Sequence, residues 1–65
     1  MNIIFNGKFI AISGDNLAAT VLELGYGERR VATAVNGRFV PIRDRDCLQL
    51  GEGDRVEILT PRHGG

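Results

Sequence analysis

The 65-residue chain contains one cysteine and one histidine, so the crosslinks that many small domains depend on are missing. The single thiol, Cys47, cannot form an intramolecular disulfide, and no Cys/His cluster typical of a structural zinc site is present. A chain of this size lies near the lower limit for folding without such crosslinks. Its fold must therefore depend on the 43% of residues that are apolar, or on a partner.

The sequence also has neither an excess of positive or negative charge nor a long apolar run. The eight basic and eight acidic residues balance, whereas nucleic-acid-binding modules usually carry a basic excess. No apolar run approaches the roughly 20 residues that span a bilayer, and the N-terminus does not have the pattern of a signal peptide. We therefore expect a cytoplasmic protein that is a monomer alone and binds neither nucleic acid nor membrane. A lone thiol suits that reducing compartment.

Catalytic machinery of the protein's own is not evident in the sequence either. There is no glycine-rich phosphate-binding loop with its lysine, and there are no paired catalytic groups. Gly25-Tyr26-Gly27 is too weak a motif to indicate a nucleotide site, and His63 has no companion ligands for a metal. These absences predict a protein that binds no cofactor or metal itself and is a substrate of enzymes.

Two Asn-Gly pairs, at 6–7 and 36–37, each lie between short runs of β-forming residues. Asn-Gly is the strongest short-range signal for a hairpin, because both central positions of a type I′ turn need positive φ. The sequence therefore predicts two hairpins, with strands over 2–5, 8–12, 31–35 and 38–40. Alternating apolar residues predict a last strand over 55–60, which Pro61 ends.

The segment 16–24 has the periodicity of an amphipathic helix. Its apolar residues form one stripe, made by Leu17, Val21 and Leu24 and widened by Ala18 and Leu22. Asp15 offers an N-cap, and Gly25 offers a C-terminal stop. A helix this short is unstable alone, so we expect it to pack its apolar face on the hairpins.

The order of elements is hairpin, helix, hairpin and strand, which indicates an α+β fold with the helix across one face of a sheet. The simplest packing places the last strand beside the first, in parallel, at the centre of the sheet. We therefore expect one domain over residues 1–60, followed by a flexible C-terminal tail over 61–65 that ends in Gly-Gly.

Three apolar side chains of the predicted strands are candidates for a contact surface. Ile4, Ile10 and Leu59 are expected to face away from the helix. Exposed apolar patches often mark sites at which partners bind. We therefore predict a possible partner patch on the open side of the sheet, near the tail.

The segment between the second hairpin and the last strand offers two kinds of candidate. Cys47 has no nearby base or second thiol in the sequence, so we expect a small buried residue and no sulfur-handling role. Arg43 and Arg45 alternate with acidic residues and are expected to be solvated loop charges.

The sequence ends in Gly64-Gly65, and we expect the Gly65 carboxylate to be the working group of the protein. Glycine has no Cβ, so the last residues could pass through a narrow channel into a buried site of another protein. Residues 61–65 extend at most about 17 Å, enough to span such a channel while the domain stays outside. A terminal carboxyl, with a pKa of about 3.3–3.7, is an anion at neutral pH and a poor electrophile, so its chemistry needs prior activation.

Four segments of the sequence resemble the small sulfur-carrier proteins of bacterial thiamine biosynthesis, the ThiS family. They are 3–7 (Ile-Ile-Phe-Asn-Gly), 21–24 (Val-Leu-Glu-Leu), 34–41 (Ala-Val-Asn-Gly-Arg-Phe-Val-Pro) and 53–59 (Gly-Asp-Arg-Val-Glu-Ile-Leu), before the final Gly64-Gly65. Together they extend over essentially the whole chain. The resemblance implies a ubiquitin-like β-grasp fold of order ββαββ(3-10)β, with a mixed sheet and one helix packed across one face.

The resemblance also implies a carrier that enzymes modify. An E1-like adenylyltransferase would use ATP to convert the Gly65 carboxylate to an acyl-adenylate. Sulfur from a cysteine desulfurase or another donor would then replace AMP to give a thiocarboxylate, and thiazole synthase would take that sulfur into the thiazole ring of thiamine. Arg62, His63 and Gly64 are the candidates for recognition of the tail by these enzymes.

Other functions stay open at this point. The same tail chemistry would serve molybdopterin or sulfur amino-acid synthesis, with only the acceptor enzyme changed. A ubiquitin-like protein modifier would instead join Gly65 to a lysine and would give conjugates of higher mass. In a binding module the tail would be idle, and deletion of Gly65 would have no effect.

Overall fold

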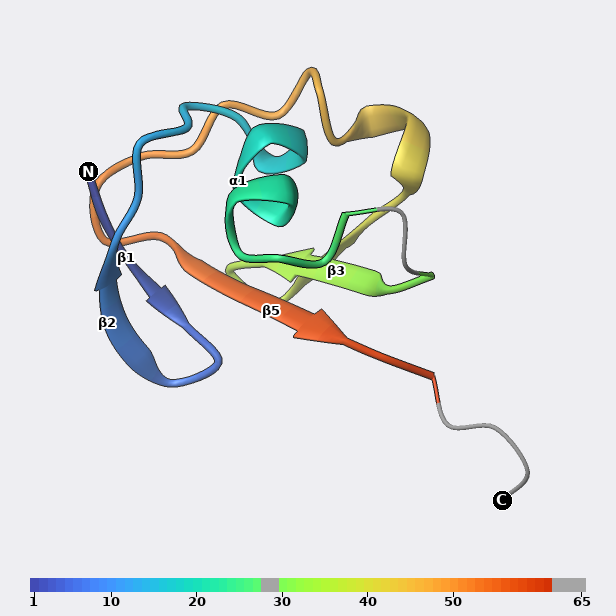
Figure 1. Cartoon of the computed structure of the whole chain (residues 1–65), viewed down its shortest axis with the longest axis horizontal. Coiled ribbons are helices and arrows are strands. Elements are labelled where there is room, and N and C mark those ends of the chain that lie inside the picture. The colour runs from blue at the N-terminus through green and yellow to red at the C-terminus, as the bar shows by residue number, and fades with distance from the viewer. Residues whose placement is uncertain (28–29, 62–65) are drawn as a thin grey trace.

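The computed structural model describes residues 1–27 and 30–61, and in these residues one helix lies across one face of a five-stranded sheet (Figure 1). The strands are β1 (Asn2–Phe5), β2 (Lys8–Ala11), β3 (Ala32–Val35), β4 (Arg38–Val40) and β5 (Arg55–Leu59), in the spatial order β2-β1-β5-β3-β4. The helix α1 spans Leu17–Glu23, and a 3-10 helix, η1, spans Ile42–Asp44. The predicted α+β fold of order ββαββ(3-10)β is confirmed.

Both Asn-Gly pairs form the predicted hairpin turns. Asn6 and Gly7 have φ values of 46° and 87°, and Asn36 and Gly37 have φ values of 51° and 83°. Positive φ at both central positions is the requirement of a type I′ turn. The two turns join β1 to β2 and β3 to β4 as antiparallel pairs.

Strand β5 occupies the centre of the sheet, as the order of elements predicted. It pairs in parallel with β1, with Phe5 opposite Val56. It pairs antiparallel with β3, with Ala32 opposite Leu59. The last strand of the chain therefore has a neighbour on each side, and the chain leaves the sheet from its middle.

Helix α1 has a different N-cap from the one predicted. Asn16 has an extended backbone, and its Oδ1 accepts a hydrogen bond of 2.8 Å from the main-chain N of Ala19. Asp15 instead accepts a hydrogen bond of 2.9 Å from Leu50 N through its main-chain carbonyl. The prediction of Asp15 is wrong, because an isolated bridge between Asn16 and Gln49 places the helix start one residue later.

Helix α1 ends at Glu23 with Leu24 as its C-cap, and Gly25 follows as the predicted stop. Gly25 has a φ of 92°, which an L residue with a side chain rarely adopts. Its N donates to Leu22 O at 3.0 Å, and Tyr26 N donates to Val21 O at 3.1 Å. This pair of hydrogen bonds is the Schellman motif, and it satisfies two carbonyls of the last helical turn.

The buried face of α1 differs from the predicted stripe. Leu17 and Thr20 are fully buried, whereas Leu22 is 62% exposed. Thr20 lies three residues after Leu17 and so shares its face, and its hydroxyl donates to Asn16 O at 3.0 Å. The prediction that Leu22 widens the apolar face is wrong, because the satisfied Thr20 takes the inward position.

The core lies between α1 and one face of the sheet (Figure 1). Its buried residues come from the strands, the helix and the loops: Ile3, Ile12, Leu17, Val21, Val31, Val35, Val40, Leu50, Val56 and Ile58. Phe5 and Tyr26 pack against this core. Their two rings are arranged edge to face, with centroids 6.2 Å apart. The other face of the sheet is left without a covering helix in the described residues.

The loop between β4 and β5 contradicts two predictions. Cys47 is exposed and not buried, because Leu48 and Leu50 take the inward positions beside it. Arg45 is only 9% exposed, and its guanidinium donates to Thr33 Oγ1 at 3.1 Å and to Val31 O at 2.6 Å. Arg45 is therefore a structural residue that ties the loop to β3, whereas Arg43 is exposed as predicted.

Candidate functional site

The tail that is predicted to carry the chemistry follows the central strand. After β5, Thr60 and Pro61 are exposed and lie beyond the paired part of the sheet (Figure 1). The candidate tail residues Arg62, His63, Gly64 and Gly65 lie outside the described residues. The described part of the site is therefore the end of β5 and the surface beside it.

The face of the sheet away from α1 has an apolar patch beside the start of the tail. Along β5 burial alternates, so Ile58 is buried and Leu59 is 67% exposed. Ala32 lies opposite Leu59, and Phe39, which is 69% exposed, lies opposite Ala34. We call Leu59, Ala32, Ala34 and Phe39 the tail-proximal patch.

This patch differs from the predicted set of Ile4, Ile10 and Leu59. Ile10 lies directly opposite the fully buried Ile3 and packs against the core. Opposite residues of an antiparallel pair share a face, so Ile10 belongs to the helix side and its prediction is wrong. Ile4 is half-buried on the open face, but it pairs with Arg55 at the other end of β5 from Leu59.

Phe39 is the large residue of the patch that the sequence analysis missed, although a signal for it existed. Val40 is 8% exposed and faces the core, so the alternation of a strand places Phe39 on the opposite face. One exposed aromatic residue in a three-residue strand predicts no site. Phe39 lies near Leu59 only because β3 lies between β4 and β5 in the sheet.

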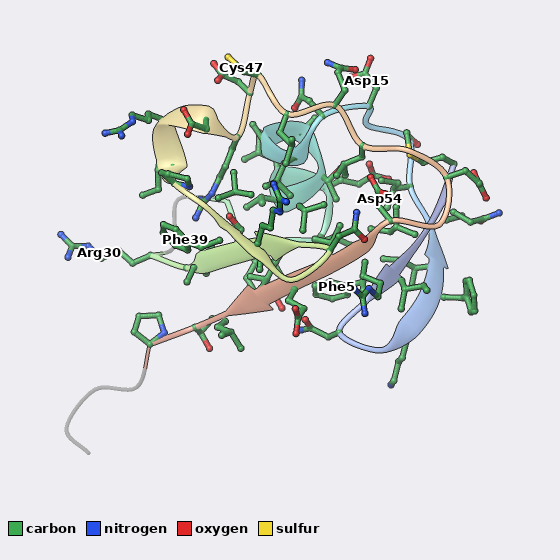
Figure 2. All side chains as sticks on the ribbon, turned by 180° about the vertical axis from the view of Figure 1, so that it is seen from behind. Phe5, Asp15, Arg30, Phe39, Cys47 and Asp54 are labelled. Carbon is green, nitrogen blue, oxygen red and sulfur yellow. The ribbon has the colours of Figure 1, made fainter. Side chains whose placement is uncertain are left out.

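A shallow hollow extends the patch toward η1. Its volume is about 520 Å³, and it is lined by Val31, Ala32, Phe39, Pro41, Ile42, Arg43 and Arg45. Ile42 is 70% exposed and continues the apolar surface. Figure 2 shows Phe39 and Arg30 near the end of the sheet from which the chain continues toward its C-terminus. This surface therefore combines apolar side chains with bordering arginines.

The one thiol of the chain is poorly suited to nucleophilic chemistry. Cys47 lines a second hollow of about 570 Å³, which shares Phe39 and Pro41 with the first. Figure 2 shows Cys47 away from the strand that leads to the tail. A hydrogen bond with Asp46, together with the charges of Asp46 and Asp44, raises the pKa of the thiol above its ordinary value of 9.0. Because the thiolate is the nucleophilic form, the raised pKa lowers the reactivity of Cys47 at neutral pH below that of an ordinary thiol.

Residues 1–27 and 30–61 contain neither a candidate membrane-spanning helix nor a candidate metal-binding cluster. No helix in these ranges is long and apolar enough to cross a membrane. No group of three or more His, Cys, Asp or Glu side chains in the same ranges could hold a metal ion.

Two solved structures are similar to this chain over its whole length. A crystal structure of the thiamine biosynthesis protein ThiS from Geobacter metallireducens is 28% identical, with 100% of each chain covered and a TM-score of 0.84. A solution NMR structure of a thiamine biosynthesis protein from the same organism is also 28% identical, with 100% of this chain and 88% of that chain covered and a TM-score of 0.80. No curated protein sequence matches the chain significantly.

The sequence model of one family, the ThiS family, matches residues 3–65. The matched region includes both Asn-Gly turns, all of β5 and the final Gly64-Gly65. The family match and the structural similarity therefore cover the same length, and they agree with the resemblance seen in the sequence. The chain belongs to the ThiS family.

Proposed function

We propose that this protein is a sulfur carrier in thiamine biosynthesis and that the Gly65 carboxylate carries the sulfur. The observation that carries the proposal is the family match, which runs through the final Gly64-Gly65. In this role the protein is a substrate of partner enzymes and has no catalytic site. A cytoplasmic location belongs to the same proposal.

The first step activates the carboxylate. An E1-like adenylyltransferase joins Gly65 to the AMP part of ATP and releases pyrophosphate, because the carboxylate anion is not itself an electrophile. The partner supplies the ATP site, and this chain supplies the reacting group. We assign recognition of the tail by the partner to Arg62 and His63, since in the sequence they precede the two glycines proposed to enter its site.

The second step replaces AMP with sulfur. A sulfur nucleophile attacks the acyl carbon of Gly65, and AMP leaves. Sulfide gives the thiocarboxylate directly, whereas the persulfide sulfur of a cysteine desulfurase also needs a thiol reductant, which supplies two electrons and cleaves the S–S bond. Thiazole synthase then takes the sulfur. Cys47 is not needed in either step, because its raised pKa leaves little thiolate.

We place the adenylating enzyme on the tail-proximal patch. Leu59 lies two residues before Pro61, so an enzyme that encloses the tail must also approach the surface around Leu59. Leu59 and Phe39 are 67% and 69% exposed and have apolar surface to bury. Such burial stabilises a complex by about 25 cal/mol per Å² before the costs of association.

Intact-protein mass spectrometry tests the proposal. The purified chain is incubated with ATP, an adenylyltransferase of this pathway, a cysteine desulfurase with cysteine, and a thiol reductant. We expect a mass increase equal to the difference between one sulfur and one oxygen, located in the C-terminal peptide. Omission of ATP and deletion of Gly65 are the controls, and an unchanged mass in the complete mixture would contradict the proposal.

The acceptor is tested separately. The thiocarboxylate form is mixed with thiazole synthase and the other substrates of that reaction, and thiazole formation is measured. We expect the carrier to return to its carboxylate mass as thiazole appears. A stable thiocarboxylate that only molybdopterin or sulfur amino-acid enzymes consume would move the function to those pathways.

A further inference from the structure

The pairing between β1 and β5 stops before β5 ends. Phe5 lies opposite Val56, and Asn6 N donates to Val56 O at 3.0 Å. At Asn6 the chain turns into the hairpin with a φ of 46°. On this side, the main chain of the first hairpin therefore offers no strand to the tail-proximal half of β5.

The side chain of Asn6 takes the place of the missing strand. Its Oδ1 accepts a hydrogen bond of 3.1 Å from Ile58 N, and its Nδ2 donates to Ile58 O at 3.4 Å. A primary amide has the same donor and acceptor as a peptide group, so it satisfies both main-chain groups of Ile58. The parallel pairing thus continues for one more step through a side chain.

This contact lies just before the start of the tail, a position that we call the root of the tail. Ile58 is three residues before Pro61, and on its other side it pairs with Thr33 of β3. In the described residues, the amide of Asn6 makes the hydrogen bonds of the first hairpin that lie nearest to the tail. Without them, the end of β5 would be paired along one edge only.

The asparagine of the second Asn-Gly turn also makes side-chain hydrogen bonds, but to the other end of β5. Asn36 Oδ1 accepts from Arg55 N at 3.0 Å, and its Nδ2 donates to Asp54 Oδ1 at 3.1 Å. Its φ of 51° is close to that of Asn6. Each turn asparagine therefore holds one end of β5, and only Asn6 holds the end that leads to Gly65.

We propose that Asn6 is a positioning residue for the chemistry at Gly65, a role that builds on the proposed function. An enzyme that docks on the domain must receive the carboxylate in a narrow range of positions, and loss of position lowers the rate of reaction. The amide of Asn6 holds Ile58, three residues before Pro61, and so fixes the point from which the tail starts. Asn6 acts through β5 and does not touch the reacting atoms.

The test compares Asn6→Gly with Asn36→Gly. Glycine keeps the positive φ of either turn but removes the amide, so each variant loses the side-chain hydrogen bonds at one end of β5. Steady-state rates of adenylation are measured against carrier concentration, together with Tm. We expect both variants to lose stability, and only Asn6→Gly to lower kcat, by about tenfold, with little change in KM.

A conservative variant separates positioning from stability. Asn6→Asp keeps an acceptor for Ile58 N and loses the donor to Ile58 O. We expect its kcat to lie between those of the wild type and Asn6→Gly, even if its Tm is as low as that of Asn36→Gly. If kcat instead follows Tm across the three variants, Asn6 has a purely structural role and the proposal is overturned.

Amide hydrogen exchange, measured by NMR, tests the same proposal without any enzyme. Exchange at Ile58 should be faster in Asn6→Gly than in Asn36→Gly, while Arg55 should show the reverse. Equal exchange at Ile58 in the two variants would overturn the proposal. A wild-type protein that is never adenylated would instead remove the proposed function, and the exchange pattern would still decide whether Asn6 holds the root of the tail.

Discussion

At the scale of single residues, the exposed carboxylate of Glu23 binds the loop that precedes α1. Glu23, at the end of α1, accepts hydrogen bonds from Ser13 N at 2.9 Å and 2.8 Å and from Gly14 N at 2.9 Å. The hydrogen bonds from Gly14 and Ser13 lower the pKa of this carboxyl. Glu23 therefore holds the loop between β2 and α1 against the helix.

We expect Glu23→Gln to lower Tm at neutral pH and to reduce the loss of stability in acid. Because the folded-state pKa is lowered, the contribution of Glu23 is complete above its ordinary value of 4.5 and is lost as the pH falls through the folded value. Thermal unfolding from neutral to acid pH, followed by circular dichroism, measures this. Glu57→Gln, another exposed carboxylate, is the matched control. A difference from wild type that stays constant on acidification would contradict the prediction.

The thiol gives a second prediction at this scale. Cys47→Ser should leave thiocarboxylate formation unchanged within about twofold, because the acidic neighbours keep the thiol protonated. Mass spectrometry of the two proteins under the same conditions checks it. In the wild type, the rate of alkylation at Cys47 should keep rising with pH beyond 9.0, where an ordinary thiol would already level off, because its pKa is raised. A fast reaction at neutral pH, or a carrier that fails without the thiol, would show that Cys47 takes part.

At the scale of elements, the loop between β4 and β5 is held to the sheet through one buried cation. Arg45 donates to Thr33 Oγ1 and to Val31 O, and the same Thr33 hydroxyl donates to Val40 O at 2.9 Å. The main-chain carbonyl of Arg45 also accepts from Ala18 N at 3.0 Å. One residue thus connects β3, β4, the loop and α1.

Arg45→Ala is therefore expected to destabilise the fold by about 2–3 kcal/mol, because it leaves buried acceptors without a charged donor. Chemical denaturation at neutral pH measures the free energy of unfolding. Arg43→Ala, on the exposed side of η1, should change it by less than about 0.5 kcal/mol. Equal effects of the two substitutions would mean that the hydrogen bonds of Arg45 contribute nothing net.

At the scale of the whole molecule, the proposed function depends on where the sheet places the start of the tail. The parallel pairing of β1 with β5 puts the last strand in the middle of the sheet, between two hairpins. The chain therefore leaves beside the open face, where Leu59 and Phe39 are exposed. In the proposed function, a partner that accepts the tail would also contact the tail-proximal patch.

We expect Leu59→Asp to weaken binding to the adenylating enzyme by about tenfold or more, since a charge would enter an apolar contact. The Tm should stay nearly unchanged, because Leu59 is 67% exposed. Phe9→Asp is the matched control: Phe9 is 77% exposed but lies on the outer strand β2, beside Ile4. Titration calorimetry of the three proteins measures the affinities, and an equal loss for both variants would refute a specific role of the patch.

The open face also shows how far local pattern extends into a candidate site. Alternation along β5 correctly predicted that Leu59 faces away from Ile58. The same kind of reasoning failed for Ile10, because the face of β2 depends on its register with β1, where Ile10 lies opposite Ile3. Leu59 and Phe39 share one surface because β5, β3 and β4 are neighbours in the sheet. The pattern of residues along each strand does not show which strands pair.

The sequence by itself determined the features that short-range physics controls. Positive φ at Asn-Gly 6–7 and 36–37 placed both hairpins, and Gly25 ended the helix. Only the tertiary structure decided that Asn16 caps the helix, that Arg45 is buried, and that Asn6 reaches a strand 52 residues away. Turn and cap conformations depend on neighbouring residues in the chain, whereas the partner of a polar side chain depends on which distant segment the fold brings beside it.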